Sequence, residues 1–149
     1  MQNKIKNQTG FSMAELVIVL AITSIIATIS IMIYKQLEPN LDLDANTRQV
    51  ASDLRYAQQL TVTEQAIYSV QFDQSHYSII NTVSAKTILS RTLKQNITLP
   101  TITGFTDNTV RFTPTGAAIQ SGIIYLKNSK NTTSSVEIKP SGYVEIHQK

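Results

Sequence analysis

Few side chains in this sequence could carry out chemistry. The chain of 149 residues holds two His and no Cys, which excludes thiol nucleophiles, disulfide bonds and cysteine-ligated zinc. It also lacks the G-x-S-x-G, Walker and H-E-x-x-H patterns, which position serine nucleophiles, nucleotide phosphates and catalytic zinc. We therefore predict that the protein is not an enzyme and that it uses no cofactor.

Two pairs of polar residues have spacings that a metal ion or an acid–base pair could use. Asp73 and His76 are three residues apart, but they fall in a predicted turn between strands, where water would solvate both side chains. Asp42 and Asp44 follow Pro39, and capping of a helix start explains them more simply than cation binding. Neither pair predicts a metal site.

Basic residues gather in the last quarter of the sequence. Lys127, Lys130 and Lys139 could form a patch that neutralises phosphates. However, Glu137 and Glu145 interrupt the series, and the chain from residue 39 onward has 10 basic and 8 acidic residues, a formal charge of only +2. We therefore favour a solvated surface, with a weak DNA contact through the three lysines as the alternative.

The strongest signal is an apolar segment over residues 11–33, in which Glu15 is the one charged residue. At about 1.5 Å per residue this segment reaches about 35 Å, enough to cross about 30 Å of hydrocarbon. Lys4 and Lys6 precede it with no acidic residue, so the positive-inside rule places the first ten residues in the cytoplasm. A secretory signal is the alternative, but the run is longer than usual and no clear cleavage site follows it.

Glu15 needs a partner, because an ionised carboxylate within a spanning helix costs about 2.5 kcal/mol or more. It should therefore face a cation or a hydrogen-bond donor. The alternative is that Glu15 lies near enough to the lipid headgroups to stay hydrated.

The residues beyond the membrane predict more helix and then strands. Pro39 is expected to kink or break the helix, with Asp44 or Asn46 capping a new segment. Apolar residues then recur at helical spacing, which predicts a helix packed on a sheet: Val50, Ala51, Leu54, Ala57 and Leu60.

Alternating runs with turn signals predict antiparallel strands at 67–72, 77–83, 87–93, 110–113, 123–126, 136–138 and 143–146. Gly142 turns the last hairpin, and residues 128–135 read as a flexible loop.

Residues 10–22, GFSMAELVIVLAI, resemble the class III prepilin signal of type IV pilins and pseudopilins. In that family a short basic leader ends in Gly, Phe usually follows, and Glu is the fifth residue after the scissile bond. The resemblance implies cleavage between Gly10 and Phe11 by a membrane prepilin peptidase, followed by N-methylation of Phe11. The Ser-Met-Ala triplet at 12–14 departs from the commoner Thr-Leu-Ile-like one but keeps these positions small or apolar.

The same resemblance implies a role for Glu15 in subunit assembly. In the family this residue pairs with the N-terminal amine of a neighbouring subunit, which here is the amine of Phe11. Removing one partner of such a buried pair leaves the other uncompensated, at a cost of about 3–5 kcal/mol. Glu15 would then be an assembly residue and not a catalytic one.

A second resemblance covers most of the remaining chain. The runs LRYAQQLTVTE at 54–64, VRFTPTG at 110–116 and VEIKPSGYVEI at 136–146 are similar to the GspH/FimT family of minor pseudopilins and minor pilins. The implied fold is α+β, with a long N-terminal helix whose first half spans the membrane and whose distal half packs on an antiparallel β-sheet domain. The implied parts are a leader at 1–10, a transmembrane assembly segment at 11–35 and an extracytoplasmic domain at 36–149.

Family membership would imply a minor pseudopilin that assembles into, or initiates, the pseudopilus of a type II secretion system. Its partners would be the prepilin peptidase, other pilin or pseudopilin subunits, the inner-membrane assembly platform and membrane lipid. It would cross the bacterial inner membrane once, with its N-terminus in the cytoplasm, and be extracted into a fibre. The alternatives are a minor type IV pilin or competence pseudopilin serving adhesion, motility or DNA uptake, and a simple anchored or secreted binding protein.

Overall fold

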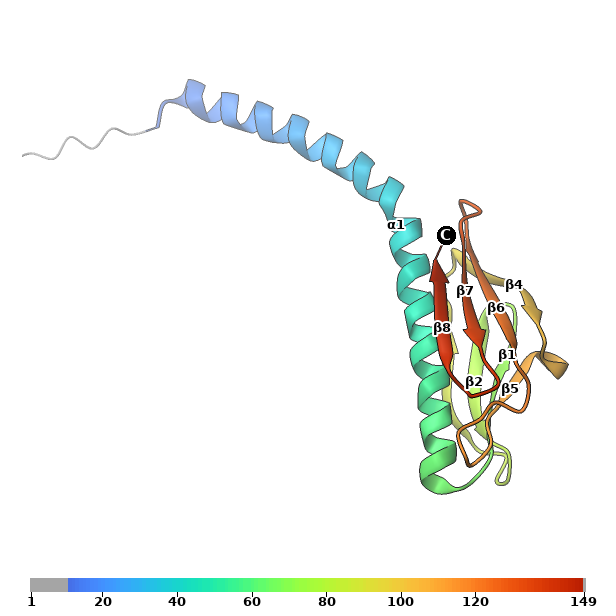
Figure 1. Cartoon of the computed structure of the whole chain (residues 1–149). Helices are drawn as coiled ribbons and strands as arrows, with labels where there is room; N and C mark the ends of the chain where they lie inside the picture. The colour runs from blue at the N-terminus through green and yellow to red at the C-terminus, as the bar shows by residue number, and fades with distance from the viewer. Residues whose placement is uncertain (1–10, 149) are drawn as a thin grey trace, which may run out of the picture. The chain divides into compact units, whose positions relative to one another are not determined.

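A computed structural model describes residues 11–148. The chain forms two compact units, Met1–Leu37 and Glu38–Lys149. A single helix, α1 (Met13–Glu64), contributes to both, and the strands all belong to the second (Figure 1). Of the two outcomes predicted at Pro39, a kink or a break, the break is wrong, because α1 continues through this residue.

The part of α1 in the first unit is apolar and has no protein around it. Every residue from 11 to 37 is exposed, and an 18-residue window has a mean hydropathy of 2.8, which suffices for crossing a membrane. Its hydroxyl groups donate to carbonyls of the same helix, as with Ser24 to Leu20 at 2.7 Å and Thr28 to Ser24 at 2.8 Å. Such bonds satisfy polar groups where lipid offers no partner.

In the second unit, α1 runs through Pro39 because its next turns are held by the domain. Asn128 Nδ2 donates to the Pro39 carbonyl at 3.2 Å and to Asn40 Oδ1 at 2.9 Å. The capping role predicted for Asp44 or Asn46 is therefore wrong, since no helix starts there; Asn46 Nδ2 instead donates to the Asp42 carbonyl at 2.8 Å. A proline inside a helix costs about 3 kcal/mol, which the packing of the following turns must offset.

Two four-stranded antiparallel sheets follow the helix, in the orders β3-β2-β1-β5 and β4-β6-β7-β8. The strands are β1 Tyr68–Phe72, β2 His76–Asn81, β3 Thr87–Thr92, β4 Ile97–Thr103, β5 Thr109–Arg111, β6 Gly122–Asn128, β7 Thr133–Ile138 and β8 Val144–Gln148, with a short turn, η1 Thr106–Asn108, before β5. The predicted α+β class, with a long N-terminal helix and antiparallel strands, is confirmed.

The seven predicted strands are all present, but β4 was missed. Pro100 lies within β4, and a proline argues against a central strand because it cannot donate to the ladder. Here β4 is an edge strand, with an irregular register between Thr98 and Thr101, which is where a sheet tolerates proline. The loop predicted at 128–135 is also wrong in part: Asn128 Oδ1 accepts the backbone N–H groups of Lys130 and Thr132, both at 2.9 Å, and β7 begins at Thr133.

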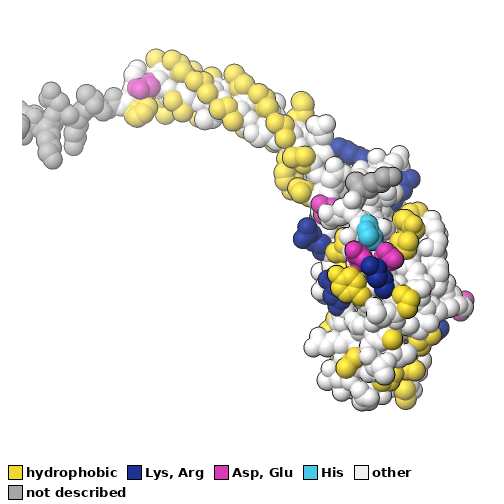
Figure 2. Space-filling view, viewed as in Figure 1, with side chains coloured by type: hydrophobic (Ala, Val, Ile, Leu, Met, Phe, Trp, Pro, Cys, Tyr) yellow, Lys and Arg dark blue, Asp and Glu magenta, His cyan; other side chains and the backbone are white. Residues whose placement is uncertain are grey.

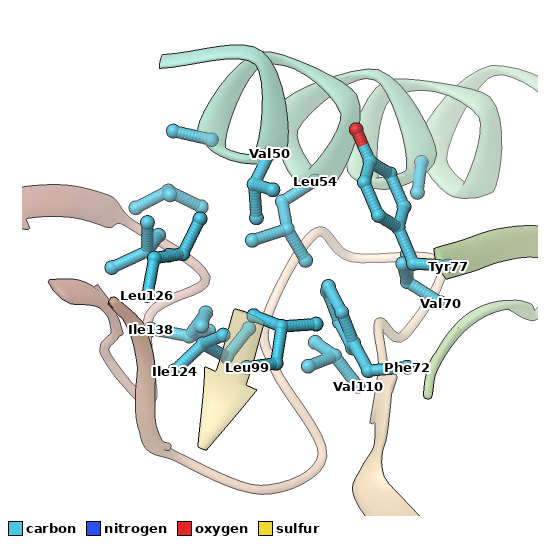
Figure 3. Packing of buried hydrophobic residues seen from close by; sticks show 14 of the residues in the cluster. Val50, Leu54, Val70, Phe72, Tyr77, Leu99, Val110, Ile124, Leu126 and Ile138 are labelled. Carbon is cyan, nitrogen blue, oxygen red and sulfur yellow. The ribbon is translucent and has the colours of Figure 1, made fainter. Parts of the chain in front are cut away.

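One hydrophobic core joins the helix to both sheets. Val50 and Leu54 project from α1 between the apolar residues of the two sheets (Figure 3). The sheet residues of this core include Val70, Phe72, Tyr77 and Val110 from the first sheet and Leu99, Ile124, Leu126 and Ile138 from the second. The predicted apolar stripe of the helix is therefore confirmed, with Leu60 only partly buried.

A buried carboxylate fastens α1 to the first sheet. Asp53, 5% exposed, accepts hydrogen bonds from Tyr77 Oη at 2.6 Å, Arg91 Nε at 2.9 Å and Gln49 Nε2 at 3.1 Å. Burial and the bond to Asp53 raise the pKa of the Tyr77 phenol, which stays a donor at physiological pH. Because its oxygens have partners on β2, β3 and α1, Asp53 can be buried while charged.

A second carboxylate of α1, that of Asp42, contacts the segment before β4. Asp42 lies 2.5 Å from Lys94 Nζ, and Asn96 Nδ2 donates to it at 3.1 Å. The hydrogen bond from Lys94 lowers the pKa of Asp42, and its effect exceeds that of burial, which acts in the opposite direction. Asp42 is therefore a structural residue of the helix–sheet contact.

We predict that Asp53→Ala lowers the free energy of unfolding by about 2–3 kcal/mol, because the buried Tyr77 hydroxyl loses its acceptor. Urea unfolding of the full-length protein in detergent, followed by circular dichroism, measures this change. Asp44→Ala is the matched control: Asp44 is an acidic residue of the same helix whose side chain forms no hydrogen bond or ion pair within the described residues, and its substitution should change stability by less than about 0.5 kcal/mol. Equal effects of the two substitutions would contradict the role of Asp53.

We also predict that the stabilising effect of Asp42 depends on pH. The pKa of this carboxyl is lower in the folded chain than its ordinary value of 3.8, so its contribution is complete above that value and is lost as the pH falls through the folded pKa. The stability difference between the wild type and Asp42→Asn should therefore stay constant down to about pH 5 and shrink between about pH 4 and about pH 2. A difference that stays constant over this range, measured by urea unfolding, would disprove the assignment.

Candidate functional site

Glu15 lies in the first turn of α1, where the helix dipole favours a negative charge. The helix begins at Met13, and the Leu16 N–H donates to the Ser12 carbonyl at 3.1 Å. Glu15 is exposed and forms no ion pair within the residues that the structure describes. A carboxylate in this position is available to a cation from outside the chain.

Phe11 precedes the helix and is 77% exposed. It lies four residues before Glu15, so both fall at the same end of the apolar segment. Gly10, the other residue of the predicted cleavage site, lies outside the described residues.

The apolar side chains around Glu15 give the first unit its chemical character. They are exposed along the whole segment, and Figure 2 shows many of them in yellow on the face in view. The large ones from residue 16 to residue 33 are Leu16, Val17, Ile18, Val19, Leu20, Ile22, Ile25, Ile26, Ile29, Ile31, Met32 and Ile33. Water is a poor solvent for such a surface, so lipid or other apolar helices must cover it.

The three lysines considered for DNA binding have different surroundings. Lys127 is half-buried on β6, and Lys130 lies in the turn between β6 and β7. Lys139 Nζ lies 2.5 Å from Glu145 Oε2 and 5.7 Å from the ring centroid of Tyr143. The hydrogen bond between Lys139 and Glu145 raises the pKa of the lysine and lowers that of the glutamate. The charge of Lys139 is thus offset within the domain.

Asp73 lies in the turn between β1 and β2, as predicted, whereas His76 is already the first residue of β2. Asp73 Oδ2 and His76 Nδ1 are 3.5 Å apart, and both side chains are about half-exposed or more. They border a polar hollow that Asp107 and Asn108 also line. These last two residues both have positive φ, 53° and 50°, and form a tight turn closed by the Thr109 N–H and the Thr106 carbonyl. Water can reach the Asp73–His76 pair, which agrees with the solvated setting predicted for it.

The structure also assembles a cluster that sequence reasoning did not identify. Glu137 on β7 is paired directly with Glu145 on β8, and His147 Nε2 lies 3.0 Å from Glu137 Oε2. One ligand atom from each of these side chains lies within 4.8 Å of the others. The alternation of Glu145 and His147 was a sequence signal for one strand face, but their position opposite Glu137 depends on the register of the hairpin.

Comparisons with protein families give two matches to this chain. The family model described as type II transport protein GspH matches residues 46–142. The model of the prokaryotic N-terminal methylation motif matches residues 5–31. No curated protein sequence matches the chain.

Solved structures share the fold of the chain at low sequence identity. The type IV minor pilin FimU of Pseudomonas aeruginosa aligns with a TM-score of 0.60 and 14% identity, over 74% of this chain and 91% of FimU. The minor pseudopilin EpsH from the type 2 secretion system of Vibrio cholerae aligns with a TM-score of 0.59 and 9% identity, over 72% of this chain and 97% of EpsH. At these identities the likeness concerns the fold.

The GspH match covers most of the second unit, including the distal part of α1 and most of both sheets, and the methylation motif covers the apolar start of the same helix. The helix, the two sheets and these matches together show that the chain belongs to the GspH family of type II transport proteins and carries a prokaryotic N-terminal methylation motif.

Proposed function

We propose that this protein is a minor pseudopilin, a structural subunit that assembles into or initiates a type II secretion pseudopilus. The observation that carries the proposal is the union, in one chain, of an N-terminal methylation motif at 5–31 with a GspH domain at 46–142. One continuous helix, α1, joins the two. Such a chain can be anchored by its apolar end and present a folded domain outside the membrane.

The proposed maturation begins at the membrane. A prepilin peptidase cuts between Gly10 and Phe11, and the new α-amine of Phe11 is N-methylated. The leader at 1–10 stays cytoplasmic, residues 11–35 span the inner membrane and residues 36–149 form the extracytoplasmic domain. The exposure of Phe11 immediately before α1 supports this assignment, because the peptidase needs access to the bond before Phe11 and the methylase needs access to the amine of Phe11.

Assembly then depends on Glu15. The mature Phe11 amine of one subunit pairs with the Glu15 carboxylate of its neighbour, supported by the inner-membrane assembly platform. Glu15 forms no ion pair within residues 11–148 and is surrounded by apolar side chains. A charge in that setting is stabilised only by an opposite charge or by water, so the pairing holds neighbouring helices in one register.

The mass of the mature N-terminus tests the proposed maturation. Protein extracted from its native membrane should begin at N-methylated Phe11 when the prepilin peptidase is present, and at Met1 when the peptidase gene is deleted. Mass spectrometry of the intact protein and of its N-terminal peptide distinguishes these forms. A chain cut after the apolar segment, or one that starts at Met1 in both strains, would overturn the proposal.

We expect Glu15→Ala to leave cleavage intact but to reduce incorporation into the pseudopilus by at least about tenfold, because the buried Phe11 amine loses its counter-charge. The measurement is the fraction of processed protein that sediments with sheared pseudopili. Glu38→Ala is the matched control, since Glu38 is an exposed acidic residue of the same helix beyond the apolar segment. Normal incorporation of the Glu15 variant, or an equal defect in the control, would refute the pairing.

A minor type IV pilin or competence pseudopilin is the second candidate function. The fold favours it as much as the first, because the chain aligns with the minor pilin FimU and the pseudopilin EpsH at nearly equal TM-scores, 0.60 and 0.59. Both functions use the same maturation and the same Glu15 pairing. Neighbouring genes for a secretin and other outer-membrane secretion components would favour the first candidate, and genes for a retraction motor or a DNA-import channel the second.

A weak DNA contact through Lys127, Lys130 and Lys139 belongs to the second candidate. The ion pair between Lys139 and Glu145 weakens it, because one of the three charges is already offset. Glu137 and Glu145 lie on the outer face of the same sheet and add negative charge there. We therefore assign no nucleic acid to this surface.

A further inference from the structure

We propose that Glu137, Glu145 and His147 bind a divalent transition-metal ion, with Zn²⁺ as the best-matched ion, on the outer face of the second sheet. The proposal is independent of the role of the chain in secretion. It concerns the hairpin of β7 and β8, which ends the described chain. Figure 2 shows a His side chain with two acidic side chains and a basic one close to it on the face in view.

The register of the hairpin brings the three ligands together. Glu137 and Glu145 are direct cross-strand partners, and His147, two residues after Glu145, projects from the same face of β8. One donor atom from each side chain lies within 4.8 Å of the others, and His147 Nε2 is already 3.0 Å from Glu137 Oε2. Donor atoms around a tetrahedral Zn²⁺ are about 3.4 Å apart, so small rotations of exposed side chains complete the site.

The donor set selects the class of ion. An imidazole nitrogen with two carboxylate oxygens suits Zn²⁺ and other borderline transition ions, whereas Ca²⁺ and Mg²⁺ prefer oxygen ligands alone. Three protein ligands leave a fourth position for water. A hollow bordered by Tyr125, Thr133 and Ser135 opens beside His147 and gives water access to that position.

The charges around the cluster also favour a cation. Two carboxylates directly opposite each other on neighbouring strands repel. The described contacts that offset this repulsion, from Lys139 to Glu145 and from His147 to Glu137, each use the Oε2 atom. A carboxylate has a second oxygen for a metal, so Zn²⁺ can bind while Lys139 remains nearby. Lys139 then competes with the ion, and its removal should strengthen binding.

A bound ion would link the last strand of the domain to its neighbour by a contact other than the backbone ladder. At its other edge β8 receives a hydrogen bond from α1, because Arg55 Nη2 donates to the Val144 carbonyl at 2.8 Å. The metal would therefore restrain the strand that lies beside the helix in the second unit (Figure 1). Slower opening of β8 is the expected physical consequence.

Isothermal titration calorimetry of the untagged full-length protein in detergent, stripped of metal with a chelator, tests the proposal with Zn²⁺. One ion should bind per chain, and both Glu137→Gln and His147→Gln should weaken binding at least about tenfold. His76→Gln is the matched control, since it changes the other histidine of the chain, which has one carboxylate partner, Asp73, at 3.5 Å. Lys139→Met should tighten binding, because it removes the competing cation.

Several outcomes would overturn the site. They are no measurable Zn²⁺ binding, binding that His147→Gln leaves unchanged, binding that His76→Gln abolishes, and Ca²⁺ bound as tightly as Zn²⁺. Hydrogen exchange gives a second readout, since Zn²⁺ should slow the exchange of β8 amides in the wild type and in His76→Gln but not in His147→Gln. Because His147 is half-exposed, its substitution should leave the fold intact, and circular dichroism confirms this before the titration.

Discussion

The burial of one face of α1 against both sheets is the interaction on which the rest of the domain depends. Val50, Ala51, Leu54 and Ala57 are fully buried there, and a large aliphatic side chain contributes about 1.5–3 kcal/mol when buried. Two such side chains already match the cost of about 3 kcal/mol for Pro39 inside the helix. Tertiary packing therefore decides that the helix continues where a local rule would end it, and Asp53 and Asp42 place it on the sheets through hydrogen bonds.

The first part of the same helix has an apolar surface that is suited to lipid and not to water. From residue 11 to residue 37 its side chains are exposed and mostly apolar, and no other described part of the chain covers them. The physical consequence is a segment that is stable only in lipid or among other helices, and the charge of Glu15 is stabilised there only by an opposite charge or by water. Under the proposed function this segment, through Glu15, carries the assembly signal of the chain.

On the outer face of the second sheet, acidic side chains are paired with basic ones. The terminal hairpin carries two ion pairs on this face, Lys139 with Glu145 and His147 with Glu137, and the two glutamates are cross-strand partners. Each exposed pair contributes little to stability by itself. Their value lies in geometry, because the backbone register holds two carboxylates and an imidazole close enough to share one ion and leaves little net positive charge for a nucleic acid.

The sequence by itself determined the features that depend on neighbours along the chain. These are the apolar segment with Glu15, the helical stripe from Val50 to Ala57, and seven strands with the hairpin at Gly142, which has the positive φ of 83° that a glycine adopts most readily. Hydrophobic period and turn chemistry act over a few residues, so they can be read without a structure.

Only the tertiary structure decided the rest. It placed β4 at a sheet edge despite Pro100, carried α1 through Pro39, gave Asp53 its partners Tyr77 and Arg91, and set Glu137 beside Glu145 and His147. Each of these outcomes depends on pairing between residues far apart in the chain. A shift of one residue in the register of β8 would turn Glu145 and His147 to the opposite face, and no local pattern in the sequence specifies that alignment.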